Sequence, residues 1–171
     1  MRELSLNVLD IAQNSLSAGA TLVEITVIAI GDNGRGMTPE QVRRVSDPFY
    51  TTRTTRKVGM GIPLFRMAAE MAGGSLDIDS VPGEGTRVTA AFGLSHIDRM
   101  PLGDMAGTLS ALIRLNPQVD FVYRHRRDGR EAALDTRELR QVLEGVPLDT
   151  PEVMEWIEGS LEEQERALEN T

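Results

Sequence analysis

The sequence predicts an α+β protein in which helices pack against a mixed, mainly antiparallel sheet. The first observation behind this prediction is an amphipathic helix near the start of the chain, with apolar side chains at helical spacing: Leu4, Val8, Ile11 and Ala12. The second is a pair of hairpin signals, since strand-like runs flank the turn sequences "VPGEG" and "RRDGR". Hairpins supply antiparallel strands, and the apolar face of an amphipathic helix must pack against another element.

The elements of the first half follow from local signals in chain order. Gly19 ends the first helix, and the β-branched run "TLVEITVIAI" that follows is typical of a strand. Thr38 followed by Pro39 predicts the N-cap and first turn of a short helix. The run "IPLFRMAAEMAGG" predicts a helix that ends at Gly73 and Gly74, and "SLDIDS" and "TRVTAAF" predict the strands of the first hairpin.

A second set of elements is predicted from about residue 95. "GDMAGTLSALIRL" indicates a helix, the second hairpin turns at Asp128-Gly129, and "DTRELRQVL" begins a short helix with an Asp or Thr cap. Thr150 caps a final acidic helix. We therefore divide the chain into residues 1–94 and a helix–hairpin–helix extension, 95–171, of unknown role.

The side chains of this extension allow alternative interpretations. We expect the final helix to bury a stripe formed by Val153, Trp156, Ile157 and Leu161, and a groove for a partner is the alternative. Four arginines surround the second hairpin turn: Arg124, Arg126, Arg127 and Arg130. Solvent exposure is their simpler interpretation, and docking onto an acidic partner or onto the acidic last helix is the alternative. His96 and His125 are interpreted as a linker and a hairpin residue, not as phosphorylation sites.

Composition excludes several classes of protein. The chain has 171 residues and no cysteine, so disulfides and thiolate metal sites are excluded. No apolar run approaches the roughly 18 residues that cross a membrane, and polar residues interrupt the N-terminal segment, unlike a signal peptide. The net charge of −8 comes almost entirely from residues 149–171, so no general nucleic-acid-binding surface is indicated. We expect a cytoplasmic protein that binds neither membrane nor nucleic acid.

A polar stripe and three glycine clusters are the candidate functional features. Spacings of 3, 4 and 3 residues place four polar side chains on one face of the first helix: Asn7, Asp10, Asn14 and Ser17. Glycines have no side chain, so they let a ligand approach the backbone and leave amides free for phosphate oxygens. They occur in three clusters: 31–36, 59–61 and 83–85. None of them is a Walker loop or a good dinucleotide fingerprint. Taken singly, each cluster is better explained as a turn.

The order of these features resembles that of the GHKL ATPase superfamily, which includes histidine kinases, MutL, DNA gyrase and the heat-shock chaperones. The polar-stripe helix comes first, followed by "DNGRGM", "DPFYTTR", "GMGI" and "GEGT". The resemblance covers residues 4–94. It is strongest to the ATP-binding domain of bacterial histidine kinases, while "NSLSAGA" with "DNGRGM" leans towards MutL. It implies the Bergerat fold, a two-layer α/β sandwich with helices on one face of the sheet, and binding of ATP or ADP with Mg2+.

The resemblance places the adenine site at "DNGRGM". Asp32 matches the residue that accepts a hydrogen bond from the adenine amino group, and Gly34, Gly36 and Met37 complete the loop that curls under the base. Thr86 matches the residue that supports this Asp and an adenine-bridging water. The chemistry agrees independently, because a carboxylate facing an amine rejects guanine, whose carbonyl would be another acceptor. The alternative is that Asp32 only forms a turn.

The polar stripe matches the phosphate side of the same site. Asn14 matches the residue whose amide oxygen coordinates Mg2+, an ion that prefers hard oxygen ligands and is expected to bridge the phosphates. Asp10 matches the catalytic residue that orients or deprotonates the attacking water. Family members usually carry Glu or Asn there, and Asp is one methylene shorter than Glu, so we expect slow hydrolysis or a water relay. A solvated helix face is the alternative interpretation of the stripe.

The segment "DPFYTTRTTRKVGMGI" matches the ATP lid of the family. Its basic residues Arg53, Arg56 and Lys57 are candidates to pair with phosphates, and Arg53 is the strongest of the three. The next helix opens with backbone amides that favour phosphate, at Gly59, Met60 and Gly61.

The chain departs from the family in the strands before "DNGRGM". Family members usually have two antiparallel strands joined by a turn, whereas "TLVEITVIAIGD" offers ten strand-like residues without a turn signal. Either the hairpin is shortened or a loop near Val27–Ile28 is missing from the chain, and we favour the second interpretation. We also expect no phosphoacceptor helix ahead of the first helix.

The expected function is that of a stand-alone histidine-kinase-like protein that binds Mg-ATP. We expect a slow ATPase or a nucleotide-driven switch in signal transduction, meeting an unknown protein partner through residues 95–171. One alternative is a protein kinase acting in trans on His or, as anti-sigma factors do, on Ser. The other alternative is a nucleotide-sensing module without turnover.

Overall fold

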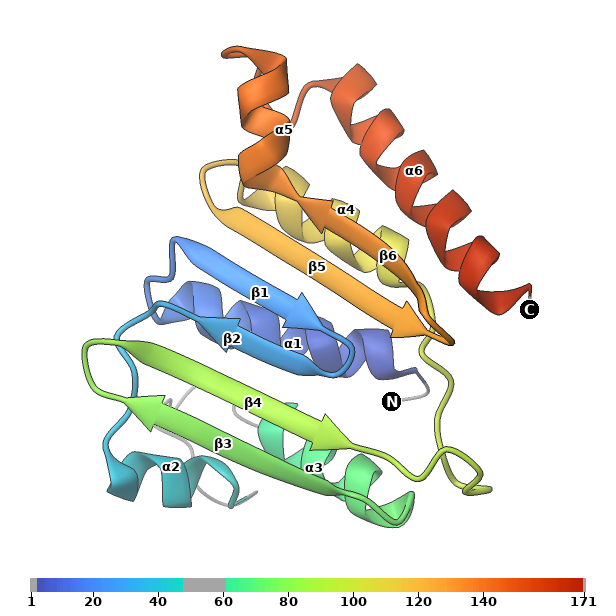
Figure 1. Cartoon of the computed structure of the whole chain (residues 1–171). Coiled ribbons are helices and arrows are strands. Elements are labelled where there is room, and N and C mark those ends of the chain that lie inside the picture. The colour runs from blue at the N-terminus through green and yellow to red at the C-terminus, as the bar shows by residue number, and fades with distance from the viewer. Residues whose placement is uncertain (1–2, 48–60, 171) are drawn as a thin grey trace.

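A six-stranded sheet forms the centre of the structure, with its strands in the order β3–β4–β2–β1–β5–β6 (Figure 1). This computed structural model describes residues 3–47 and 61–170. The strands are β1 (Leu22–Thr26), β2 (Ala29–Asp32), β3 (Ser75–Val81), β4 (Gly85–Ala91), β5 (Asp120–Arg127) and β6 (Arg130–Asp135). Neighbouring strands pair antiparallel except β1 and β5, which pair in parallel. The predicted mixed, mainly antiparallel sheet is therefore confirmed.

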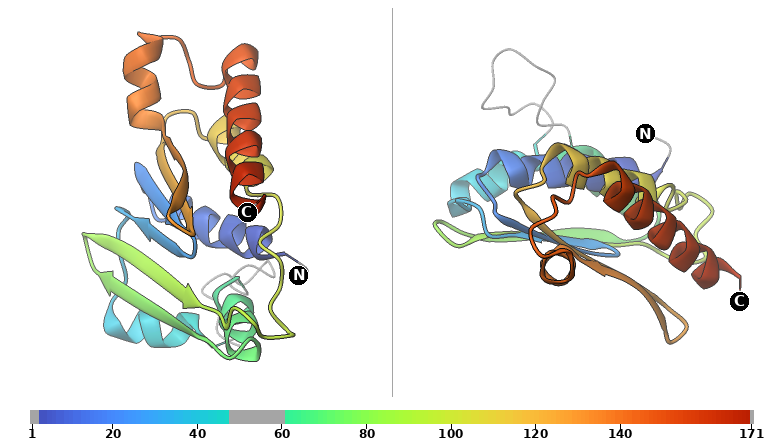
Figure 2. Two further views of the ribbon diagram at one scale, coloured as in Figure 1. Left: turned by 45° about the vertical axis from the view of Figure 1, so that its right-hand side comes forward. Right: turned by 90° about the horizontal axis from the view of Figure 1, so that it is seen from above.

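Four helices cover one face of this sheet (Figure 2, right): α1 (Leu4–Ser17), α3 (Gly61–Met71), α4 (Met105–Leu115) and α6 (Pro151–Glu169). Helix α1 contacts β1 and β2 and packs against both α3 and α4, while α6 packs on α4 and β6. Their apolar faces bury one continuous core against the sheet. The predicted α+β class with helices on one face is thus confirmed. None of the described helices is long and apolar enough to cross a membrane.

Helix α2 (Pro39–Val45) begins where the sequence predicts. The Thr38 hydroxyl accepts a hydrogen bond from the Gln41 backbone N–H over 3.2 Å, and the Gln41 side chain accepts one from the Thr38 N–H over 2.9 Å. This capping box satisfies two donors that the first turn would otherwise leave unpaired. It fixes the point at which the chain leaves the glycine-rich loop after β2.

The β1–β2 pair forms an antiparallel hairpin whose connection consists of Val27 and Ile28. Ile25 lies opposite Ile30, and both side chains are buried beneath α1. The two strands thus pair and bury their apolar face with a two-residue connection.

Residues 95–171 extend the same sheet. Strand β5 pairs in parallel with β1, and the apolar core runs without interruption from α1 to α6. The β5–β6 hairpin turns at Asp128 and Gly129, whose φ angles of 51° and 79° are those that a two-residue Asp-Gly turn requires. The predicted boundary at residue 94 lies in the connection between β4 and α4.

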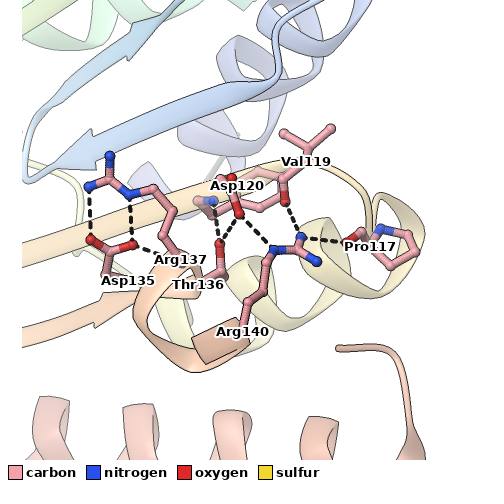
Figure 3. Close-up of polar contacts among 8 residues, drawn as sticks. Pro117, Val119, Asp120, Asp135, Thr136, Arg137 and Arg140 are labelled. Carbon is pink, nitrogen blue, oxygen red and sulfur yellow. Dashed lines mark hydrogen bonds and ion pairs between the residues drawn. The ribbon is translucent and has the colours of Figure 1, made fainter. Parts of the chain in front are cut away.

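Helix α5 (Thr136–Leu143) is tied to β5 by a group of polar contacts (Figure 3). The Thr136 hydroxyl accepts a hydrogen bond from the Phe121 N–H over 2.9 Å and donates to the Asp120 carboxylate over 3.1 Å. Arg140 donates from Nε to the same carboxylate over 2.8 Å and from Nη2 to the Pro117 carbonyl over 2.6 Å. These contacts hold the short helix against the strand although its surface is mostly polar.

Trp156 does not belong to the core, so the predicted stripe of α6 is wrong at this residue. Its side chain is 56 % exposed. The buried line of α6 is instead formed by Met154, Ile157, Leu161 and Leu168. Trp156 lies two positions beyond Met154, which rotates it to the far side of the helix, because successive helical residues are about 100° apart.

The basic hairpin partly meets the acidic last helix. Arg130 donates a hydrogen bond from Nη1 to the Ala167 carbonyl over 2.9 Å. On the helix-covered face of β5, Tyr123 donates to Glu165 over 2.7 Å, and His125 Nδ1 lies 2.8 Å from the other oxygen of that carboxylate. The remaining arginines of the turn are exposed to solvent, which agrees with the simpler of the two interpretations.

Candidate functional site

Asp32 ends β2 on the helix-covered side of the sheet. Its Oδ2 atom accepts a hydrogen bond from the Ser15 hydroxyl over 2.6 Å, and its Oδ1 atom accepts one from the Gly34 N–H over 2.9 Å. Both contacts fix the orientation of the carboxylate, which stays half-buried. A carboxylate has about four acceptor positions, so two remain for donors of a ligand.

The loops after β2 and before β4 need glycine because they pack directly on each other. A Cβ atom at Gly85 would lie 2.0 Å from the Asp32 carbonyl oxygen, and one at Gly36 would lie 2.0 Å from the Val81 carbonyl oxygen. Gly36 also has a φ of 69°, which favours glycine. Gly34 has no room for a side chain either, since its Cβ would lie 2.9 Å from the carbonyl oxygen of Ala18. The glycines thus let two loops and the end of α1 converge on Asp32.

Two further side chains hold these loops in place. The Ser80 hydroxyl accepts a hydrogen bond from the Met37 N–H over 2.8 Å and lies 2.8 Å from the Thr86 hydroxyl. The Asn33 side chain accepts from the Thr21 and Leu22 N–H groups over 2.8 and 2.9 Å. Met37 is therefore attached to β3, and the start of β1 is attached to the loop after β2.

Thr86 lies directly opposite Asp32 in the β2–β4 register, as its expected role requires. Its hydroxyl pairs with Ser80, however, and the hydroxyl that reaches the Asp32 carboxylate belongs to Ser15. Ser15, Ser80 and Asn33 were not singled out from the sequence. The sequence does contain a signal for Ser15, because it is a polar residue on the apolar stripe of α1. In the structure it is 3 % exposed.

The polar stripe of α1 faces the start of α3. A Cβ atom at Gly61, the first residue of α3, would lie 3.1 Å from the Asp10 Cβ. Asp10 is half-buried there, and burial raises the pKa of its carboxyl above the ordinary value because the charged form is partly desolvated. Asn14 is exposed, and its side chain forms no hydrogen bond with the part of the chain that the structure describes. Its amide oxygen is therefore available to a ligand.

The structure links the two predicted halves of the site through helix α1. Ser15, which holds Asp32, follows Asn14 directly in α1, and Asp10 lies one turn before Asn14. Five predicted residues lie outside the described residues: Arg53, Arg56, Lys57, Gly59 and Met60. The expected lid that contains them lies there too.

The side chains of the site suit a magnesium ion that is coordinated mainly by waters and by the phosphate oxygens of a bound molecule. Among residues 3–47 and 61–170, no three His, Cys, Asp or Glu side chains are grouped so as to hold a metal ion. A single amide oxygen, that of Asn14, is compatible with Mg2+, which keeps several waters and takes oxygens from phosphates.

Residues 1–96 match the family model described as histidine kinase-, DNA gyrase B- and HSP90-like ATPase. The chain belongs to this ATPase family. The resemblance deduced from the motifs is therefore confirmed, and this part of the chain is an ATP-binding domain of that type.

Several of the proteins with similar sequences are bacterial sensor proteins. The chain is 32 % identical over 62 residues to sensor histidine kinase ZraS of Klebsiella oxytoca, which is 36 % of this chain and 13 % of that protein. It is 35 % identical over 71 residues to sensor histidine kinase YxdK of Bacillus subtilis, covering 39 % and 22 % of the two chains. Sensor protein SrrB of Staphylococcus aureus is 42 % identical over 65 residues, covering 35 % and 11 %. The chain thus spans between a tenth and a quarter of these relatives.

Solved structures share the fold over most of the chain. The N-terminal domain of a DNA repair protein matches with a TM-score of 0.53 and 16 % identity, covering 79 % of this chain and 53 % of that one. The Aquifex aeolicus MutL ATPase domain complexed with ADP matches with a TM-score of 0.51 and 17 % identity, covering 84 % and 70 %. The Bergerat fold expected from the sequence is confirmed.

Proposed function

We propose that the protein binds Mg-ATP between α1, α3 and the loop after β2, and acts as a slow ATPase or a nucleotide-driven switch. The observation that carries this proposal is the Asp32 carboxylate, which Ser15 and Gly34 hold in one orientation while acceptor positions remain free. A fixed carboxylate with free acceptor positions suits the exocyclic amine of adenine. Membership of an ATPase family and the ADP-bound MutL neighbour support the same ligand.

Each candidate residue has a distinct chemical part in this proposal. Asp32 receives the adenine amine. The base pocket is shaped by Gly34, Gly36 and Met37 in the loop after β2 and by Thr86 on β4. Asn14 holds Mg2+ through its amide oxygen, and the ion supplies positive charge to the phosphates. Arg53, Lys57, Gly59, Met60 and Gly61 remain proposed phosphate contacts from sequence.

Asp10 is the proposed general base. Its carboxylate accepts a proton from the water whose oxygen attacks the γ-phosphorus, and ADP leaves as the bond to the γ-phosphate breaks. The raised pKa of Asp10 makes it a better proton acceptor than an ordinary aspartate. Its short side chain nevertheless limits its reach, so we propose slow turnover.

The relatives favour one alternative and the short side chain of Asp10 favours another. Similarity to sensor histidine kinases supports a kinase that acts in trans on His or Ser. The short side chain of Asp10, the proposed general base, supports a nucleotide sensor without turnover. In each case we propose a protein partner at residues 95–171, where Trp156 is exposed, and a cytoplasmic location where ATP is available.

Nucleotide binding and phosphate release separate these functions. Calorimetry with ADP and ATP in the presence of Mg2+ tests binding, and absence of binding would refute the whole proposal. Phosphate release under saturating Mg-ATP distinguishes an ATPase from a sensor. Transfer of radioactive γ-phosphate to proteins of a cell extract, without release of free phosphate, would favour the kinase.

A further inference from the structure

Asn7 is the buried one of the two members of the polar stripe, Asn7 and Ser17, to which the proposed function gives no part. It is 1 % exposed, and neither its Oδ1 nor its Nδ2 atom hydrogen-bonds to any of the residues that the structure describes. A buried amide without partners destabilises a folded protein, because both groups lose their hydrogen bonds to water. Leucine has a similar shape and would avoid that cost. A partner that the described residues do not supply, such as a water or a group ordered by a ligand, would remove this cost.

The position of Asn7 indicates where that partner lies. Asp10 follows it by three residues, and residues at i and i+3 are neighbours on the surface of a helix. Exposure falls along the stripe, from Asn14, which is exposed, through Asp10, which is half-buried, to Asn7, which is buried. Because α3 begins against the Cβ of Asp10, the buried end of the stripe lies about one helical turn from this contact.

We infer that Asn7 is a positioning residue for Asp10, and that its Nδ2–H group donates a hydrogen bond toward the Asp10 carboxylate, directly or through one water, when nucleotide is bound. This inference rests on the proposed ATPase function. The amide donor stabilises the carboxylate form and fixes its direction, which offsets the shorter reach of aspartate. Asn7 itself does not touch the nucleotide.

The described surroundings of Asp10 favour a neutral hydrogen-bond donor as the group that stabilises its carboxylate. Burial raises the pKa of Asp10, and among the described residues of α1, α3, α4, β1 and β2 no charged side chain contributes to the shift. A carboxylate that is partly desolvated and has no cationic partner depends on hydrogen bonds for the stability of its charged form.

The inference is tested by comparing Asn7→Leu with Ser110→Ala. Ser110 lies on α4, is 4 % exposed, and its hydroxyl also lacks a hydrogen-bond partner among the described residues, so it controls for removal of a buried unpaired group. Both variants should keep or raise the melting temperature. Asn7→Leu should lower kcat for ATP hydrolysis by about tenfold or more, while the KM for ATP and the Kd for ADP change less than about twofold. Ser110→Ala should keep the wild-type kcat.

The pH profile of kcat provides a readout that a structural role would not change. Loss of the amide donor raises the pKa of Asp10 further, so the acid limb of the profile should move to higher pH in Asn7→Leu but not in Ser110→Ala. If Asn7→Leu does not fold, Asn7→Ala serves in its place with the same expected changes.

Each outcome decides between the two proposals. Wild-type kcat and an unshifted acid limb in the Asn7 variant, with ADP binding intact, would overturn the inference alone. Nucleotide binding without turnover in the wild type would also overturn it, because Asp10 would then have no water to orient. Failure of the wild type to bind ADP would refute the proposed function.

Discussion

The Ser15 hydroxyl on α1 donates a hydrogen bond of 2.6 Å to the Asp32 carboxylate at the end of β2. Ser15 is almost fully buried and Asp32 is half-buried, so the contact joins the helix layer to the sheet layer inside the protein. It also joins the two halves of the site, because Asn14 precedes Ser15 in the same helical turn. The orientation of the carboxylate that we propose to recognise adenine thus depends on a residue beside the proposed magnesium ligand.

Replacement of Ser15 by alanine should weaken both the fold and the proposed adenine site. A hydrogen bond to a charged group contributes about 1.5–3 kcal/mol, so we expect a loss of stability of that order and a weaker Kd for ADP. Urea unfolding and calorimetry measure the two effects. Ser17→Ala, which removes an exposed hydroxyl of the same helix, is the control and should change little. Unaltered ADP affinity in Ser15→Ala would mean that the contact does not orient the base-binding carboxylate.

Asp32 should make the protein select adenine over guanine. Asp32→Asn replaces a charged acceptor by an amide that also donates, so it should lose about 2–3 kcal/mol of ADP binding. Calorimetry with ADP and GDP measures both the selectivity and its loss. Asp79→Asn, which alters an exposed carboxylate on β3, is the matched control. Equal affinities of the wild type for ADP and GDP would rule out the adenine pocket at Asp32.

The dependence of ATP binding on Mg2+ should require Asn14. Asn14→Ala removes an exposed amide oxygen, so the fold should be nearly unchanged while Mg-ATP binding weakens strongly. Binding of ATP in the presence of a chelator should change little. Calorimetry with and without Mg2+ gives both values. A comparable loss in the two conditions would show that Asn14 acts on the nucleotide or the fold and not on the metal.

Much of the fold could be predicted from the sequence because its signals are local. The Thr38-Pro39 cap, the Asp128-Gly129 turn and the apolar spacing of α1 each depend on residues within a few positions of one another. The parallel pairing of β5 with β1 could not be predicted in this way, because about a hundred residues separate the two strands and the pairing leaves no periodic pattern. The exposed side of Trp156 was missed because four apolar residues close together on α6 fit more than one face of the helix.

The candidate site shows the same division between local and distant information. Ordered motifs indicated Asp32, Asn14 and Asp10, but the contacts that hold Asp32 and its loop are set by packing between distant segments. Ser80, on β3, reaches Met37 across 43 positions of sequence, and no local pattern marks that contact. Similarly, Asn7 belonged to the predicted stripe, and only the structure distinguishes it as the buried member.

The contact between β5 and α6 should contribute measurably to stability. Tyr123 is fully buried and donates to Glu165 over 2.7 Å, and burial beside this carboxylate raises the pKa of the Tyr123 phenol, which therefore remains a donor at all ordinary pH values. Tyr123→Phe should lower the free energy of unfolding by about 1–3 kcal/mol. Arg126→Ala, which breaks an exposed ion pair with Glu131, should change it much less. Equal effects of the two variants in urea unfolding would mean that the buried contact is no stronger than a surface pair.

Asp10 should reduce stability at neutral pH. Its pKa is raised in the folded protein by burial, so the folded state binds its proton more tightly than the unfolded state does. Stability from this group is therefore fully present below the unfolded pKa, near 3.8, and is lost as pH rises through the raised folded pKa. Asp10→Asn keeps the shape of the side chain and removes this titration, so it should be more stable than the wild type at pH 7.

The advantage of Asp10→Asn over the wild type should shrink as pH falls toward 4, because the wild-type carboxyl then becomes neutral too. Urea unfolding of both proteins from pH 4 to pH 7 measures this change, and Asp79→Asn, at an exposed carboxylate, should show no comparable gain at pH 7. The same substitution should abolish ATP hydrolysis, since an amide cannot accept the proton of water. A variant that gains stability and loses turnover together would identify Asp10 as a group kept for chemistry, whereas unchanged stability across this range would show that its burial has no energetic consequence.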